Sequence, residues 1–101
     1  MTTKHETQES IASWAEDTFG PVTQQSVLVD RAMAEMAELR DAVLLNNPVE
    51  IGKEAADVVI LLYRILELNG SDLHSEVTLK MGENRTRKWN AKGDGTGSHI
   101  K

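Results

Sequence analysis

Proline is scarce in this sequence, and its placement constrains the fold more than any other feature. Proline occurs only at positions 21 and 48, and the segments around both are rich in Ala, Leu, Glu and Met, which favour helix. Pro21 follows a glycine and marks the end of one helix, whereas Pro48 suits the first turn of another. The sequence therefore predicts an all-α protein with four helices, at about 6–18, 26–45, 48–68 and 72–88, with Ser71 as the N-cap of the last.

The length of 101 residues fits a single domain that occupies residues 1–101. Glycines at 93, 95 and 97 follow the last expected helix, so we expect a flexible tail at about 90–101. A chain this short buries a limited fraction of its surface. The third helix also carries Ile60 and Tyr63 outside its main apolar stripe, which indicates burial on more than one side. We therefore expect a bundle completed by assembly, as a homodimer or a dimer of dimers.

Composition narrows the class of protein. The absence of cysteine excludes disulfides, a thiolate nucleophile and cysteine zinc sites. The net charge of −5 argues against a nucleic acid polymer as partner. Residues 1–18 lack the basic start and apolar run of a signal peptide, and the longest strongly apolar stretch, 58–62, is too short to span a membrane. We therefore expect a cytoplasmic protein without a membrane partner.

Two pairs of acidic residues lie close to the apolar faces of the second and third helices. At about 100° per residue, Glu35 falls beside the apolar Leu28 and Ala42, and Glu38 projects next to it. On the third helix Glu54 falls inside the apolar arc, and Asp57 falls at its margin. Buried carboxylates are unfavourable unless they are paired or bound to metal.

This arrangement gathers four acidic groups near one point, where a divalent cation would relieve their mutual repulsion. Oxygen ligands alone suit Mg²⁺ or Mn²⁺ better than zinc or copper. Each pair on its own is also common on ordinary solvated helices, so the periodicity leaves a metal site and two solvated faces as alternatives.

The fourth helix changes along one face from apolar to cationic. Leu73 and Val77 begin this face, and Lys80, Asn84 and Arg87 continue it, with Lys88 nearby. A lysine, an amide and an arginine on an inward face suit phosphate oxygens. Cations near a helix C-terminus also complement the helix dipole, which is the alternative explanation. Elsewhere, Trp14 suits either packing or contact with a base.

These residues together resemble a known family. The segments 35–38 (EMAE) and 54–57 (EAAD), fifteen residues apart, are similar to the Glu-Glu-x-x-Glu and Glu-x-x-Asp signature of MazG-like, all-α nucleoside triphosphate pyrophosphohydrolases. The segment 80–89 (KMGENRTRKW) looks like the Lys-Asn-Arg segment that follows in that family. Residues 14–21 (WAEDTFGP) and 89–101 look like compact, bacteriophage-type members. The leading glutamate of the first motif is replaced here by Ala34, so any role of that glutamate in activating water is in question.

The resemblance implies a four-helix MazG-like bundle completed by dimerisation, with the site near the interface. It implies a Mg²⁺-dependent reaction, with Mn²⁺ as a substitute, that converts a nucleoside triphosphate into the monophosphate and pyrophosphate, as in cleansing of the nucleotide pool. The implied metal-binding and catalytic residues are Glu35, Glu38, Glu54 and Asp57. The implied substrate-binding residues are Lys80, Asn84, Arg87, Lys88 and Trp14.

Three other interpretations compete with this one. A non-catalytic helical interaction module of the same fold predicts that the four carboxylates do not converge and that metal has no effect. A di-iron carboxylate protein would use Glu-x-x-His pairs, which the second and third helices lack. A third interpretation keeps the fold and assigns another phosphoanhydride substrate, such as a modified nucleotide.

Overall fold

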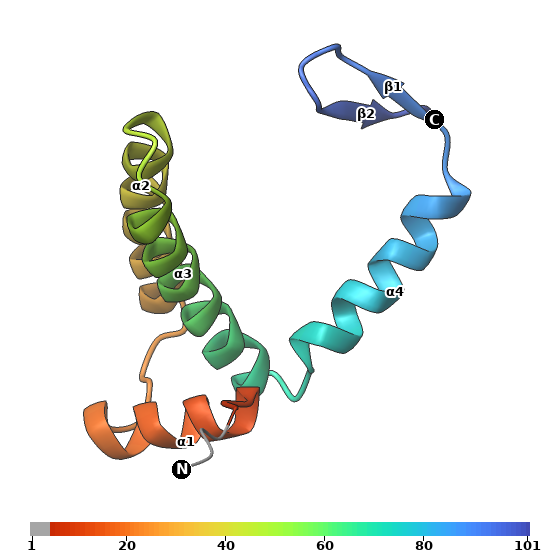
Figure 1. The fold of residues 1–101 in the computed structure, drawn as a ribbon. Coiled ribbons are helices and arrows are strands. Elements are labelled where there is room, and N and C mark those ends of the chain that lie inside the picture. The colour runs from red at the N-terminus through yellow and green to blue at the C-terminus, as the bar shows by residue number, and fades with distance from the viewer. Residues whose placement is uncertain (1–4) are drawn as a thin grey trace.

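The computed structural model describes residues 5–101 and contains all four predicted helices (Figure 1). They are followed by two short strands, so the described chain is mostly helical and not all-α. In chain order the elements are α1 (Gln8–Phe19), α2 (Ser26–Leu44), α3 (Pro48–Leu68), α4 (Leu73–Thr86), β1 (Trp89–Ala91) and β2 (Gly97–His99).

Helices α2 and α3 lie side by side and form the centre of the molecule (Figure 1). Leu28 and Ala42 of α2 are buried together with Val58 of α3. The connection between the two helices is short because Asn46 adopts a left-handed conformation, with φ of 53°. Asn47 then caps α3, and its side-chain oxygen accepts a hydrogen bond from the Glu50 amide at 3.2 Å. This tight turn fixes how the acidic residues of α2 and α3 face each other.

Helix α1 lies across the end of this pair where α3 ends, and it packs on α3 through the buried Ala15 (Figure 1). It begins two residues later than predicted because Thr7 is the N-cap. The Thr7 hydroxyl accepts from the Ser10 amide at 3.0 Å, and the Ser10 hydroxyl accepts from the Thr7 amide at 2.8 Å. This capping box places Gln8, the first helical residue, in a buried position beside the start of α4.

Helix α4 does not return to the other three helices, so the four-helix bundle is not formed within one chain. Figure 1 shows α4 extending away from the end of α3, and within the described chain none of its side chains is buried. The prediction that Ser71 caps this helix is wrong. Asp72 is the N-cap, and its carboxylate accepts a hydrogen bond from the Ser75 amide at 2.9 Å. The helix ends at Thr86, two residues earlier than predicted.

The predicted flexible tail is also wrong, because residues 89–99 form an antiparallel hairpin. Trp89 pairs with His99 and Ala91 with Gly97 in the register of the two strands. The turn between them needs positive φ at Gly93 and Gly95, at 93° and 92°, which glycine adopts without strain. The glycines that suggested flexibility therefore serve a defined turn.

The shape of the chain is open. Its solvent-accessible surface is 8152 Å², whereas a compact protein of 11.2 kDa would expose only about 5,700 Å². Its radius of gyration is 16.4 Å, against about 13 Å for a compact chain of this length. Among the described residues no helix combines the length and the apolar character needed to cross a lipid bilayer.

Candidate functional site

Three of the four predicted carboxylates converge between α2 and α3. Glu35, Glu38 and Glu54 each offer a carboxylate oxygen, and these oxygens all lie within 4.8 Å of one another. The i, i+3 spacing on α2 places Glu35 and Glu38 on one face, and the short turn to α3 brings Glu54 opposite them. Glu35 and Glu54 are half-buried, whereas Glu38 is exposed. The periodicity argument is thus confirmed for these three residues.

The negative charge of this carboxylate cluster is not balanced by the side chains around it. One carboxylate oxygen of Glu35 and one of Glu54 are buried and have no hydrogen-bond partner within residues 5–101. Burial, followed by the neighbouring carboxyl groups of Glu38 and Glu35, raises the pKa of Glu54 to about 7. Arg31, four residues before Glu35, offers only a 3.5 Å ion pair with a side chain that is 65% exposed. One exposed arginine cannot neutralise three acids.

This donor set fits a hard divalent cation. Its members are carboxylates only, which suits Mg²⁺ or Mn²⁺ rather than softer metals. A cation at this point would satisfy the two unpaired buried oxygens and remove the repulsion that raises the pKa of Glu54.

Asp57 lies outside this group of three but close to it. It lines a cavity of about 680 Å³ that Glu35 also lines, so both carboxylates border one space. Asp57 is exposed, at the margin of the α3 stripe as the helical periodicity predicts. Its part in a metal site stays a prediction.

The same cavity has an aromatic and cationic wall. Trp14 and Phe19 lie about one and a half turns apart on α1. Their rings meet edge to face, with centroids 5.5 Å apart. The guanidinium of Arg64 stands 5.6 Å from the Phe19 ring centroid, in cation–π contact. Trp14, Phe19 and Arg64 all line the 680 Å³ cavity. Carboxylates that hold a divalent cation would suit the anionic end of a ligand, bound through that cation, and the aromatic rings would suit a flat apolar end.

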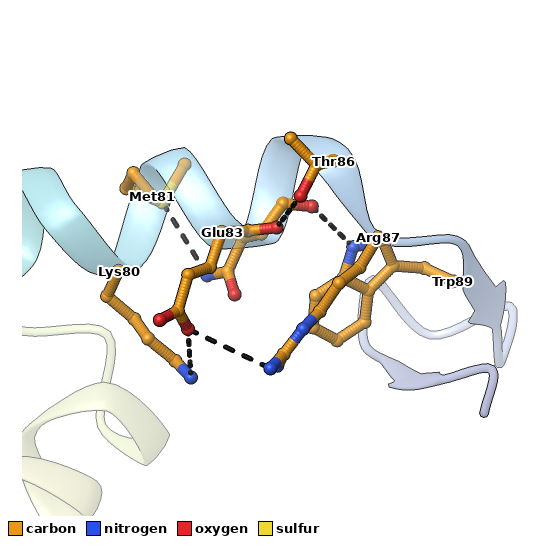
Figure 2. Close-up of polar contacts among 7 residues, drawn as sticks. Lys80, Met81, Glu83, Thr86, Arg87 and Trp89 are labelled. Carbon is orange, nitrogen blue, oxygen red and sulfur yellow. Dashed lines mark hydrogen bonds and ion pairs between the residues drawn. The ribbon is translucent and has the colours of Figure 1, made fainter.

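The basic residues of α4 stand apart from this cavity. Lys80 and Arg87 both approach the Glu83 carboxylate, at 3.2 and 3.8 Å, as Figure 2 shows. The inward face expected for them is not covered by the helices of the same chain, because α4 extends away from α2 and α3 (Figure 1). The side-chain oxygen of Asn84 is buried without a hydrogen-bond partner in the described chain. Lys88 lies beyond the end of α4 and is exposed.

Some residues of this region were not singled out from the sequence. Arg64 follows Asp57 by seven residues, two turns on the same helical face, and that spacing was a usable signal. Glu83 lies three residues after Lys80 and four before Arg87, the spacing of helical ion pairs. Gln8 gave no such signal, because its partners lie 59 to 65 residues away in the chain.

Comparison with known proteins finds relatives among bacteriophages. No protein-family profile matches the chain. A dATP/dGTP diphosphohydrolase of Salmonella phage PMBT28 is 37% identical over 93 residues, which is 92% of this chain but only 30% of that protein. A dATP/dGTP diphosphohydrolase of cyanophage S-2L is 29% identical over 95 residues, 94% of this chain and 86% of that protein.

The fold has a solved counterpart. The MazG-like pyrophosphohydrolase of cyanophage S-2L, determined with dGDP and three catalytic Mn²⁺ ions per active site, superposes with a TM-score of 0.73. The match covers 93% of this chain and 89% of that one, at 28% sequence identity. The likeness therefore extends over both sequence and fold.

Proposed function

We propose that this chain, a MazG-like protein of the phage type, is a metal-dependent pyrophosphohydrolase that converts nucleoside triphosphates to nucleoside monophosphates and pyrophosphate. The names of both phage relatives support purine deoxynucleotides, dATP and dGTP, as the substrate class. Because the chain spans less than a third of the Salmonella phage relative, the activity of that whole protein is carried over here only as a proposal.

One observation carries the proposal: three carboxylates from two helices meet within 4.8 Å and leave two buried oxygens unpaired. A helical module that only binds partners has no need of such a cluster, since three uncompensated acids destabilise the fold. The Mn²⁺ ions bound by the cyanophage structure support the same conclusion from a related protein.

The proposed chemistry assigns a task to each part of the site. Glu35, Glu38 and Glu54 would hold divalent metal, with Asp57 beside them. Bound there, such ions would supply the positive charge that polarises phosphorus and activates a water for attack. The water oxygen attacks the α-phosphorus and gives a proton to a carboxylate of the cluster, the phosphoanhydride bond between the α- and β-phosphates breaks, and pyrophosphate leaves.

The remaining residues act on the substrate. Lys80, Asn84 and Arg87 would neutralise the charge that develops on the phosphate oxygens, with Lys88 nearby. Trp14, in the wall of the cavity, would contact the base. A carboxylate of the cluster orients or deprotonates the water, and Ala34 in the place of the family's leading glutamate removes one candidate for that task.

The proposal includes assembly into at least a dimer. Val29, Met33, Met36 and Val43 recur along one face of α2 at intervals of four, three and seven residues, and all are exposed. The chain exposes about 2,400 Å² more than a compact protein of its mass. A standard interface covers only about 800 Å² on each partner, so this excess is enough for a large one. A stable, folded monomer at micromolar concentration in sedimentation would contradict assembly.

A pyrophosphate-release assay tests the activity directly. The purified protein is incubated with Mg²⁺ or Mn²⁺ and a panel of ordinary and modified nucleoside triphosphates. Wild type should release pyrophosphate, fastest from dATP and dGTP, and Glu54→Gln should not. Asp41→Asn is the matched control, since Asp41 is an exposed acid on the same pair of helices. Absence of pyrophosphate release from every nucleotide would favour the non-catalytic interaction module.

A further inference from the structure

A half-buried cation, Arg64 of α3, borders the same 680 Å³ cavity as Glu35 and Trp14. Its guanidinium stands 5.6 Å from the centroid of the Phe19 ring. A cation–π contact of this kind uses the face of the ring and occupies none of the five N–H donors of an arginine side chain. The contact therefore holds the guanidinium in the cavity wall and leaves its donors available.

The neighbouring acids do not take up these donors. Within residues 5–101 the Arg64 guanidinium forms neither an ion pair nor a hydrogen bond, and the ion pairs there involve other cations. Its expected partner is Glu67, three residues later on α3. The Glu67 carboxylate instead accepts a hydrogen bond from the side-chain nitrogen of Gln8 at 3.0 Å. The guanidinium is thus left to bond with water or with a ligand in the cavity.

The position of Arg64 along α3 suits the base of a nucleotide better than its phosphates. Arg64 follows Asp57 by 64 − 57 = 7 residues and Glu54 by 64 − 54 = 10 residues. At about 1.5 Å per residue, these separations are about 10 Å and about 15 Å along the helix axis. Phosphates held at the carboxylates through a divalent cation would therefore lie well away from Arg64. The far edge of a purine, carried on an extended sugar, would lie close to it.

The donor pattern of a guanidinium distinguishes one class of purine from another. An arginine side chain donates through a planar fork and has no acceptor. A 6-oxopurine such as guanine presents two acceptors side by side, N7 and O6, whereas adenine presents N7 beside an amino group that is itself a donor. A guanidinium can therefore form two hydrogen bonds to the edge of a 6-oxopurine but only one to the same edge of adenine.

We propose that Arg64 is a specificity-determining residue that binds the N7 and O6 edge of the base, so that the site prefers 6-oxopurine deoxynucleoside triphosphates to dATP. The proposal rests on the proposed function and adds to it which purine the cavity selects. The Phe19 ring holds the guanidinium in place. Two hydrogen bonds to one base edge discriminate strongly between bases, so we expect a preference of about tenfold.

Steady-state kinetics with dGTP, dATP and deoxyinosine triphosphate (dITP) test this assignment. The kcat/KM of wild type for dGTP should exceed that for dATP by about tenfold. Because dITP keeps O6 and N7 but lacks the 2-amino group of guanine, it should behave like dGTP. Arg64→Gln should lower kcat/KM for dGTP and dITP but not for dATP, since a glutamine amide pairs with the N6 and N7 edge of adenine. Arg31→Gln is the matched control, because Arg31 lines the same cavity and its loss should leave the dGTP to dATP ratio unchanged.

The ratio of the nucleotides separates base recognition from other roles of Arg64. An equal loss for all three nucleotides in Arg64→Gln would mean that Arg64 only packs in the wall or contacts phosphate, and it would overturn the proposal. A wild type that turns over dGTP and dATP equally would overturn it as well. Arg64→Met, which keeps an unbranched side chain against Phe19, replaces Arg64→Gln if the melting curve shows that Arg64→Gln does not fold.

A binding measurement distinguishes failure of this proposal from failure of the proposed function. A wild type that is inert with every nucleotide overturns the proposed function. Calorimetric titration with dGDP and dADP in Mg²⁺ then tests base recognition without turnover. Wild type should bind dGDP about tenfold more tightly than dADP, and Arg64→Gln should not. Equal affinity of wild type for the two diphosphates, or no binding of either, would overturn the role of Arg64.

Discussion

Replacement of Gln8 by alanine should destabilise this protein although Gln8 lies outside its apolar core. The substitution keeps a good helix former at the start of α1 but deletes the contacts of the Gln8 side chain to the elbow, the connection at residues 69–72 between α3 and α4. The Leu73 amide loses its acceptor, and the Ser71 carbonyl and Glu67 carboxylate each lose a donor. Because Gln8 is buried, water replaces these contacts only in part.

The size of the effect follows from the number of hydrogen bonds and their burial. A hydrogen bond within a protein adds about 1 kcal/mol net to the free energy of unfolding, and a buried polar group left without a partner lowers it by about 1–3 kcal/mol. Three bonds in a part-buried setting therefore correspond to about 2 kcal/mol of unfolding free energy. In a domain of about this length that lowers the melting temperature by roughly 8–16 °C. Turnover should fall as well, since α4 would lose its fixed direction.

Thermal unfolding followed by circular dichroism, at one protein concentration, measures the stability change. Gln25→Ala is the matched control, because it also removes a glutamine contact to the elbow. Its partner Asn69 is exposed and keeps its bond to the Ile65 carbonyl, so we expect a loss of less than about 1 kcal/mol. Equal melting temperatures for Gln8→Ala and Gln25→Ala would refute the claim that Gln8 holds the elbow.

Three further predictions concern the cavity and the carboxylates. The pKa of Glu54 is raised from about 4.5 to about 7. Without metal, protonation of Glu54 therefore contributes stability that is fully present below pH 4.5 and is lost as the pH rises through 7. In chelator, the melting temperature of wild type should fall from pH 5 to pH 8, and that of Glu54→Gln should change less. Millimolar Mg²⁺ or Mn²⁺ should raise the melting temperature of wild type. Asp57→Ala should abolish this shift, whereas Asp41→Ala, on the solvent side, should keep it. A wild-type melting temperature that metal does not change would count against the site. Trp14→Ala should raise KM roughly tenfold with little change in kcat, since stacking on a base contributes about 1–3 kcal/mol to binding; steady-state kinetics with an unchanged KM would remove Trp14 from the site.

Local signals in the sequence predict much of the fold and part of the site. Helices α1 and α3 begin at capping side chains, α3 has Pro48 in its first turn and α1 ends at Gly20, because these signals act over a few residues. Helical periodicity alone identified Glu35 and Glu54 as acids on apolar arcs, and both are half-buried with an unpaired oxygen. The convergence of Glu38 with them follows from its i, i+3 relation to Glu35.

The contacts that the sequence did not predict are those between distant segments. The direction of α4 depends on Gln8, whose partners lie about 60 residues away, so no local pattern reports it. The C-terminal hairpin depends on Gly97, where a Cβ atom would collide with the Asn90 carbonyl, and on positive φ at Gly93 and Gly95. From the sequence alone, glycines that a tight turn requires cannot be distinguished from glycines in a flexible tail.

The chain acquires its structure in an order that follows from the exposure of α4. Helices α2 and α3 are joined by a three-residue turn, so their contacts lie close in sequence and form early in folding. A 14-residue helix with no buried side chain in the described chain has little besides its own backbone to sustain it, and helices of this length are marginal alone in water. The amides of α4 should therefore exchange with solvent faster than those of α3. Full protection of α4 should come last, when other surface covers its apolar side chains.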